Sequence, residues 1–182
     1  VLFRSIELGR ASIDGFLDGG VRPVVKHIPG HGRANADSHL ELPRVTASLA
    51  ELSGRDFVTF RSLNNAPVAM TAHVVFEAID PNRPATSSPR VIRQVIRGEM
   101  GFDGLLLCDD LSMGALSGPL VSRAKSALFA GCDVVLHCNG RLAEMQEIAE
   151  AVPQLTGQAE RRAGSALALL RTPSPLDIER AE

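Results

Sequence analysis

Four short apolar runs alternate with segments of helical spacing, and this alternation limits the folds open to the chain more than any other feature. The runs cover residues 21–27, 67–74, 104–109 and 132–138, and each is rich in Val, Leu or Ile and largely continuous rather than alternating. Continuous apolar runs of this length are typical of strands that are buried on both faces of a parallel sheet. We therefore expect an α/β protein whose helices lie outside a parallel sheet.

Apolar residues recur every three or four positions between and after these runs. The Ser-Pro pair at 88–89 predicts the start of a helix that ends before Gly101. Further helices are predicted around 52–63, after the first run, and around 142–148 and 163–170, after the last one. The expected order is β-α-β-α-β-α-β-α-α, which begins with a strand.

Each apolar run ends in polar, reactive side chains. They are Lys26, His27, His73, Asp109, Asp110, His137 and Asn139. Such groups at the carboxyl ends of successive strands are typical of a (β/α)8 barrel, whereas an open sheet gathers them at one switch point. A complete barrel takes about 250 residues and eight strands. The chain has 182 residues, so we expect the C-terminal half of a (β/α)8 TIM barrel, with the N-terminal strands missing and a frayed tail over 171–182.

Composition argues against several kinds of partner. The 19 Lys and Arg residues against 21 Asp and Glu residues give a net charge of -2 without a basic stripe, so we expect no nucleic-acid partner. No apolar run approaches the ~20 residues of a membrane helix, and the first residues lack a signal-peptide pattern. Cys108, Cys132 and Cys138 lie in apolar stretches, which is typical of a reduced compartment. We therefore expect a cytoplasmic protein with no membrane partner.

The segment 26–43 follows the first predicted strand and holds three of the five histidines. Its glycines and prolines predict a long loop, and long loops at strand ends are usually functional. His27, His31 and His39 could ligate a metal ion. However, they lack the spacing of a known zinc site and Lys26 would oppose a cation, so we expect neither metal nor cofactor.

Two carboxylates could take part in acid–base or nucleophilic chemistry. Asp37 precedes His39 by two residues, so it could orient the imidazole and stabilise its protonated form, or the two could belong to a simple local turn. Asp109 and Asp110 end a buried strand, where a carboxylate either caps the next segment or faces a site. Strand alternation places these two on opposite faces, and spacing does not say which one faces the substrate. His137 is expected in the core.

Two motifs closely resemble family 3 glycoside hydrolases, in particular the bacterial β-N-acetylhexosaminidases of cell-wall recycling. The first is KHIPGHG at 26–32, with DSH at 37–39 and LP at 42–43. The second is CDDLSM at 108–113, which resembles the nucleophile segment of the family. The resemblance extends over about residues 12–170, and it implies a (β/α)8 barrel and a partial family 3 catalytic domain over 1–182.

The resemblance also implies roles for individual residues. It implies that Asp109 is the nucleophile, that His39 is the general acid/base on a mobile loop with Asp37 as its partner, and that Lys26 and His27 bind sugar hydroxyls. Apart from the resemblance, His73 and Met113 are candidates for lining the site, although His73 could instead pack in the core. The implied reaction is a retaining hydrolysis through a covalent glycosyl-Asp intermediate, which releases terminal β-linked N-acetylglucosamine from muropeptides derived from peptidoglycan. The chain has no Trp or Tyr and only seven Phe, which favours a small carbohydrate substrate over a long polysaccharide.

Two alternatives remain open. One is another family 3 β-glycosidase or a phosphorylase, because a histidine repels an incoming phosphate less than a carboxylate would. The other is a catalytically silent barrel fragment. Family members also use an acid and an arginine from the first half of the barrel, so we predict that the isolated 182-residue chain has little activity. Its open sheet edges predict self-association.

Overall fold

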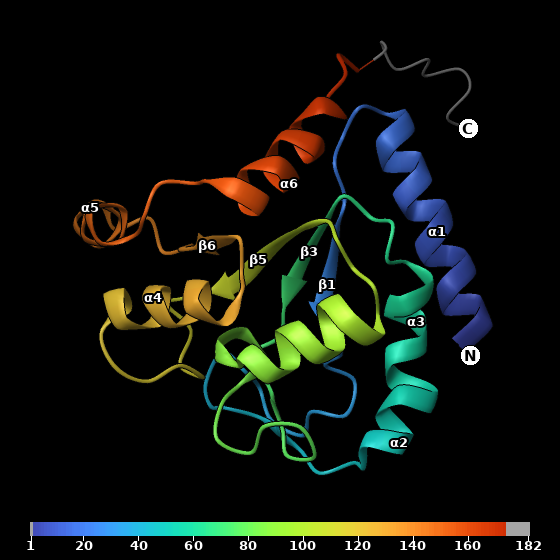
Figure 1. The fold of residues 1–182 in the computed structure, drawn as a ribbon, viewed down its shortest axis with the longest axis horizontal. Coiled ribbons are helices and arrows are strands. Elements are labelled where there is room, and N and C mark those ends of the chain that lie inside the picture. The colour runs from blue at the N-terminus through green and yellow to red at the C-terminus, as the bar shows by residue number, and fades with distance from the viewer. Residues whose placement is uncertain (1, 174–182) are drawn as a thin grey trace.

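The computed structural model describes residues 2–173 and contains a four-stranded sheet in the order β1-β3-β5-β6 (Figure 1). Its strands are β1 (Val24–Ile28), β3 (Val68–Thr71), β5 (Leu105–Asp110) and β6 (Val134–Leu136). Two shorter strands, β2 (Arg44–Val45) and β4 (Val75–Phe76), pair with each other. All these pairings are parallel, which confirms the predicted α/β class.

Helices follow most of the strands. The α-helices are α1 (Leu2–Asp18), α2 (Leu49–Glu51), α3 (Phe57–Ser62), α4 (Leu120–Ala130), α5 (Leu142–Ala151) and α6 (Gly157–Ala168). A π-helical turn (Leu52–Asp56) joins α2 to α3, a 3₁₀ turn covers Ala85–Ser87, and a longer π-helical segment covers Val91–Glu99. Within residues 2–173, no helix combines the length and the apolar character needed to cross a membrane.

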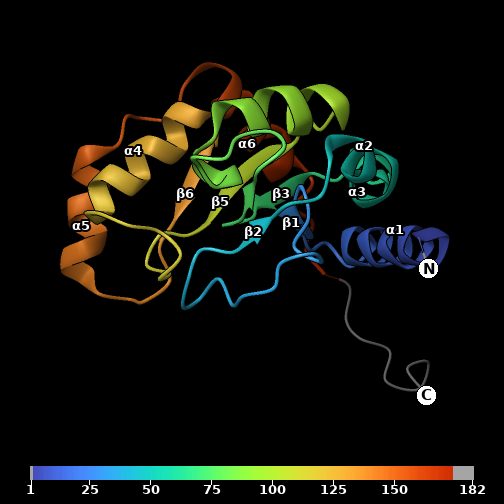
Figure 2. The same cartoon turned by 90° about the horizontal axis from the view of Figure 1, so that it is seen from below.

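One face of the sheet packs against helices and forms the core. Figure 2 shows α3, α4 and the Val91–Glu99 segment on the same side of the strands. Ala69 and Leu106, which are neighbours in register, are 0% exposed on this face. The Ser88 hydroxyl accepts a hydrogen bond from the Val91 N–H, so the predicted helix start at 88–89 is confirmed.

The opposite face of the sheet is only partly covered. Lys26, Met70, Leu107 and Val134 form one row in register across all four strands, and each keeps some exposure to solvent. In this sheet β1 and β6 are the edge strands. The sheet therefore has a buried, helix-covered side and an open side, as expected of part of a barrel wall.

The start of the chain differs from the expectation. The sequence-based order begins with a strand, whereas the structure begins with α1. Two glycines weaken the helical pattern there, because glycine has a low helix propensity. One of them, Gly9, lies so close to Leu63 that a Cβ at this position would be 2.9 Å from Leu63 Cδ1. Packing against α3, with Ile13 buried beside Leu63 and Ala66, therefore stabilises a helix that local propensity does not favour.

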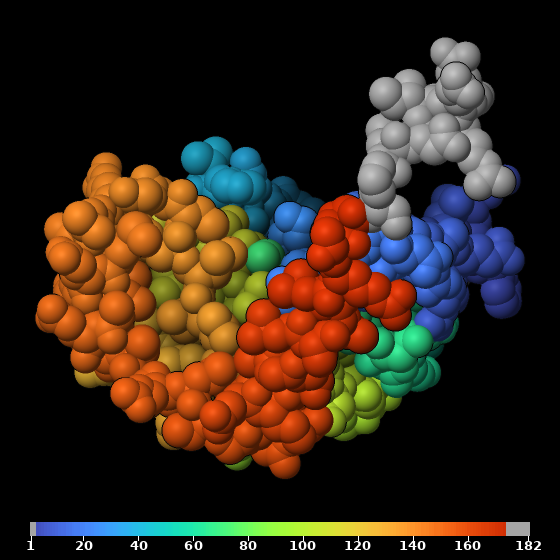
Figure 3. All heavy atoms as spheres, turned by 90° about the horizontal axis from the view of Figure 1, so that it is seen from above, coloured from blue at the N-terminus to red at the C-terminus, as the bar shows by residue number. Residues whose placement is uncertain are grey.

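An ion-pair network joins α6 to the end of the sheet where the strands begin. Asp133, 5% exposed at its side chain, accepts hydrogen bonds from Arg97 Nη2 at 2.7 Å, Leu106 N at 2.9 Å and Arg162 Nη1 at 3.0 Å. Arg162, on α6, also contacts the exposed Asp103. Figure 3 shows α6 lying across this end of the molecule, beside α5.

The predicted tail at 171–182 lies outside the described residues from 174 onward. The three cysteines are free thiols; Cys108 and Cys132 are buried, and Cys138 is exposed. Burial raises the pKa of the Cys108 thiol to about 12, so this residue is a core side chain and not a nucleophile.

Candidate active site

The carboxyl ends of β1 and β5 bring His27 and Asp109 together. His27 Nε2 lies 3.6 Å from Asp109 Oδ2, and the two side chains are 31% and 14% exposed. Burial lowers the pKa of His27, and the nearby Asp109 carboxylate opposes this shift only in part. Near neutral pH, His27 is therefore a neutral hydrogen-bonding group beside a partly accessible carboxylate.

The Asp110 carboxylate has different partners from the Asp109 carboxylate. Its carboxylate accepts hydrogen bonds from the N–H and hydroxyl of Ser112 and from the N–H of Cys138. Burial raises the pKa of Asp110, but these hydrogen bonds outweigh it and leave the pKa below its usual value. Asp110 thus stabilises the turn after β5, while Asp109 faces His27, in agreement with the predicted alternation.

Asp37 and His39 form a hydrogen-bonded pair on the loop after β1. Asp37 Oδ1 lies 2.9 Å from both His39 Nδ1 and the His39 backbone N. The backbone bond, followed by the ring bond, lowers the pKa of the Asp37 carboxyl. The segment is also a local turn, because the N–H groups of Leu40 and Glu41 bond to the Asp37 carbonyl. The carboxylate orients the imidazole, whose side chain is 75% exposed.

Gly114 connects the loop carrying His39 to the segment that follows Asp109. Its N–H donates a hydrogen bond of 3.1 Å to the His39 carbonyl. Within residues 2–173, no hydrogen bond or ion pair joins the His39 side chain directly to Asp109 or to His27. The contact at Gly114 therefore brings the two candidate catalytic segments side by side. Sequence reasoning did not identify it, since a contact between two loops leaves no periodic pattern.

Substituting Gly114 with alanine is expected to displace the His39 loop. The new Cβ would lie 2.8 Å from the His39 carbonyl oxygen and 2.9 Å from the Leu40 carbonyl oxygen, too close for backbone atoms to remain in place. Hydrogen exchange of residues 37–41 should become at least several-fold faster. Gly32→Ala is the matched control, because a Cβ added at Gly32 would meet nothing within 4 Å. Equal exchange in both variants would contradict this role of Gly114.

The other predicted site residues occupy different environments. Lys26 is exposed on the open face of the sheet, and the Lys26–His27 and Ile28–Pro29 peptide bonds are cis. His73 is 0% exposed and Met113 is 8% exposed, so both lie below the accessible surface. His73 Nε2 lies 3.0 Å from the Asp110 carbonyl oxygen.

Two histidines outside the predicted site set also have defined partners. His31 lies near His27, with ring centroids 5.9 Å apart, and its Nε2 lies 3.2 Å from Ser38 Oγ. His137 Nε2 lies 2.8 Å from Glu144 Oε2, and the His137 side chain is 7% exposed, as predicted, but its buried Nδ1 has no hydrogen-bond partner among residues 2–173. Hydrogen bonds from Asn139, then His137, lower the pKa of Glu144 to about 2. Among the described residues, no group of three or more His, Cys, Asp or Glu side chains is placed to hold a metal ion.

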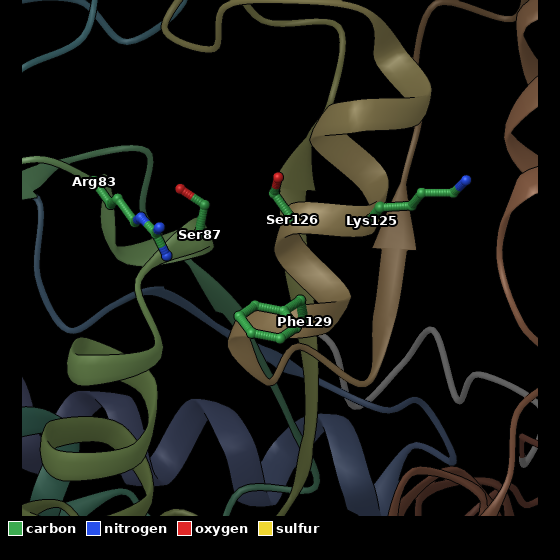
Figure 4. A pocket seen from close by; sticks show the side chains of 5 residues that line it. All are labelled: Arg83, Ser87, Lys125, Ser126 and Phe129. Carbon is green, nitrogen blue, oxygen red and sulfur yellow. The ribbon is translucent and has the colours of Figure 1, made fainter.

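A cavity on the outer helical layer contains none of these candidates. Figure 4 shows its lining, which comes from the 3₁₀ turn, the loop before it and α4. The lining residues are Arg83, Ser87, Lys125, Ser126 and Phe129, around a volume of about 390 Å³. The candidate active site is therefore defined by the strand ends and not by this cavity.

Parallel strands that present a carboxylate and histidines at their carboxyl ends are arranged as in the active sites of (β/α)8 barrels. Residues 4–168 match the glycosyl hydrolase family 3 N-terminal domain. The chain belongs to this family. It is 49% identical over 138 residues to a β-hexosaminidase of Alkalilimnicola ehrlichii, a match that covers 74% of this chain and 39% of that protein. It is 41% identical over 172 residues to a β-hexosaminidase of Tolumonas auensis, covering 92% and 49%.

Solved structures give the same result. The chain resembles NagZ from Neisseria gonorrhoeae, in complex with N-trifluoroacetyl-D-glucosamine, with a TM-score of 0.80 and 33% identity over 97% of this chain and 51% of that one. It also resembles a family 3 β-N-acetylglucosaminidase from a Paenibacillus species, with a TM-score of 0.78 and 35% identity over 90% and 33%. The chain spans about half or less of each of these proteins. The predicted family and the predicted barrel-type fold are confirmed.

Proposed function

We propose that this chain forms the catalytic half of a retaining β-N-acetylhexosaminidase that releases terminal β-linked N-acetylglucosamine. One arrangement carries the proposal. A partly exposed carboxylate, Asp109, lies at a strand end beside His27, and an oriented Asp37–His39 pair lies on the adjoining loop. The names of the β-hexosaminidase relatives support the choice of an amino sugar.

In the first step, Asp109 attacks the anomeric carbon while the bond to the leaving oxygen breaks. His39, protonated at both ring nitrogens, gives its Nε2 proton to that oxygen, and Asp37 accepts the hydrogen bond from Nδ1–H and stabilises the positively charged ring before the transfer. In the second step, the same imidazole takes a proton from water, and the resulting hydroxide displaces Asp109 from the sugar. An imidazole suits both roles near neutral pH.

Lys26 and His27 complete the proposed site by binding sugar hydroxyls. Lys26 is exposed on the open face of the sheet, and His27 lies next to the attacking carboxylate. Hydrogen bonds to hydroxyl groups discriminate between sugars more strongly than apolar contacts do. We further propose that the leaving group is the muramyl part of a muropeptide and that the enzyme works in the cytoplasm, both on the strength of the family resemblance.

The reaction can be tested with two chromogenic sugars. Nitrophenyl N-acetylglucosaminide and nitrophenyl glucoside are offered to the 182-residue chain and to a chimera in which the N-terminal half of the Alkalilimnicola ehrlichii relative precedes it. The chimera should cleave the first sugar with retention of configuration, and the isolated chain should show little turnover. Preference for the glucoside would indicate another β-glycosidase. A sugar 1-phosphate formed in phosphate buffer would indicate a phosphorylase, the alternative that His39 in place of a carboxylic acid favours.

Replacing His39 with alanine should affect poor leaving groups most. Cleavage of the nitrophenyl sugar is expected to slow by about 10²- to 10⁴-fold, the usual contribution of general acid–base catalysis. Formation of the glycosyl-enzyme from a dinitrophenyl sugar, whose leaving oxygen needs little proton donation, should change far less. Pre-steady-state release of the two phenols measures the difference. The same loss with both substrates would remove His39 from the acid role.

A further inference from the structure

Arg123, in the first turn of α4, binds the backbone of the segment that follows Asp109. Its Nη1 donates to the carbonyl oxygens of Leu111 at 2.7 Å and Met113 at 3.2 Å, and its Nε donates to that of Gly118 at 2.9 Å. None of the carboxylates described in residues 2–173 forms an ion pair with Arg123. Its Nε and Nη1 donors therefore bind one stretch of backbone, residues 111–118.

His73 binds the same segment from the side of β3. Its Nε2 lies 3.0 Å from the Asp110 carbonyl oxygen. A carbonyl only accepts hydrogen bonds, so Nε2 carries the proton. Nδ1 lies 2.8 Å from the hydroxyl of Thr86, which in turn lies 2.8 Å from the Thr71 hydroxyl. These buried contacts fix the orientation of the ring, and burial lowers the pKa of His73 and so keeps it neutral.

The backbone of Asp110 passes this restraint on to Asp109. The Asp110 N–H donates a 2.9 Å hydrogen bond to Asp109 Oδ1, while the carbonyl of the same residue accepts from His73. The other carboxylate oxygen, Oδ2, is the one that faces His27. A shift of the Asp110 backbone would therefore turn the Asp109 carboxylate.

We propose that His73 and Arg123 are positioning residues that fix the direction of the Asp109 carboxylate by holding the backbone after β5. Neither side chain needs to touch the sugar. The inference rests on the proposed function, because it gives Asp109 the role of nucleophile. Misplacing a reacting group by about 1 Å can cost about 10²-fold in rate, so restraint at this position bears directly on catalysis.

The first test uses the 182-residue chain and needs no activity. Nitrogen NMR of His73 should show a neutral ring protonated at Nε2 between about pH 6 and pH 8, on either side of the usual histidine pKa. Hydrogen exchange of residues 110–116 should become at least tenfold faster in His73→Leu and in Arg123→Met. His73→Gln, which can keep a donor toward the Asp110 carbonyl, should restore most of the protection, and Arg123→Lys should restore part of it. Lys125→Met, an exposed change on the same helix, should leave exchange unchanged.

A proton on Nδ1 instead of Nε2, or unchanged exchange in both disruptive variants, would overturn the proposal. The conservative variants keep this test decisive if a disruptive variant fails to fold. The carboxyl carbon resonance of Asp109 distinguishes a positioning role of His73 from a merely structural one. That resonance should shift in His73→Leu and return in His73→Gln, and an identical resonance in all three proteins would also overturn the proposal.

The second test measures kinetics in the chimera described above. His73→Leu and Arg123→Met should lower kcat by about 10- to 100-fold and change KM by less than about threefold. Lys125→Met should match the parent chimera. An equal rise in KM with kcat unchanged would contradict a positioning role. If the parent chimera does not cleave the amino sugar, the proposed function fails, while the exchange and NMR results still decide whether the two residues hold this backbone.

Discussion

Replacing Asp109 with alanine should lower kcat of the completed barrel by about 10³-fold or more, equivalent to about 4 kcal/mol of transition-state stabilisation. The carboxylate that faces His27 would be lost, and with it the covalent bond to the sugar. Intact-mass spectrometry after rapid quenching should detect a glycosyl-enzyme in the parent protein and none in the variant. Added azide should restore turnover by entering the vacated space, giving an α-linked glycosyl azide.

The neighbouring carboxylate supplies the control. Asp110→Asn removes the charge but keeps an oxygen that can accept from Ser112 and Cys138. This variant should still form the glycosyl-enzyme, although more slowly if the turn after β5 loosens. Equal loss of the intermediate in both variants, with no rescue by azide, would show that Asp109 is not the nucleophile.

The largest expected effect on stability comes from Asp133. Its replacement by alanine leaves the largely buried Arg97 guanidinium without its carboxylate and the Leu106 N–H without an acceptor. Breaking a buried pair on one side usually costs about 3–5 kcal/mol, which is a large part of the free energy of unfolding of a typical domain, about 5–15 kcal/mol. Urea unfolding followed by circular dichroism measures the change in the free energy of unfolding.

Asp103→Ala is the matched control, because Asp103 contacts Arg162 but is 65% exposed at its side chain. Exposed ion pairs usually contribute less than about 1 kcal/mol, so this variant should unfold close to the parent. Similar losses in the two variants would show that burial of the pair is not the source of its stabilisation.

Patterns within short stretches of the sequence predicted the strands of the main sheet and one helix start. Continuous apolar runs located β1, β3, β5 and β6 to within a few residues, and the serine at 88 marked the start of the next helix. Strand alternation separated Asp109 from Asp110. The carboxyl ends of parallel strands lie at the same edge of a sheet. The strand assignment therefore also predicted that His27 and Asp109 lie near each other.

Features that depend on tertiary contact could not be predicted in this way. Helix α1 forms because Gly9 allows close packing on Leu63, although glycine weakens the helical signal. His73 follows a strand like the other polar residues, yet its hydrogen bonds to Thr86 and to the backbone of Asp110 keep it below the surface. The contact at Gly114 joins two loops whose separation in the sequence gives no sign that they meet. The roles of the site residues remain predictions.

The network around Asp133 lies at the end of the sheet where the strands begin, whereas Asp109, His27 and the His39 loop lie at or beyond the opposite ends. The buried ion-pair network and the candidate active site therefore lie at opposite ends of the same strands. Substitutions at the candidate active site do not remove any of the groups that bind Asp133. Side chains at these strand ends could therefore change by sequence drift without loss of the buried ion pair between Arg97 and Asp133.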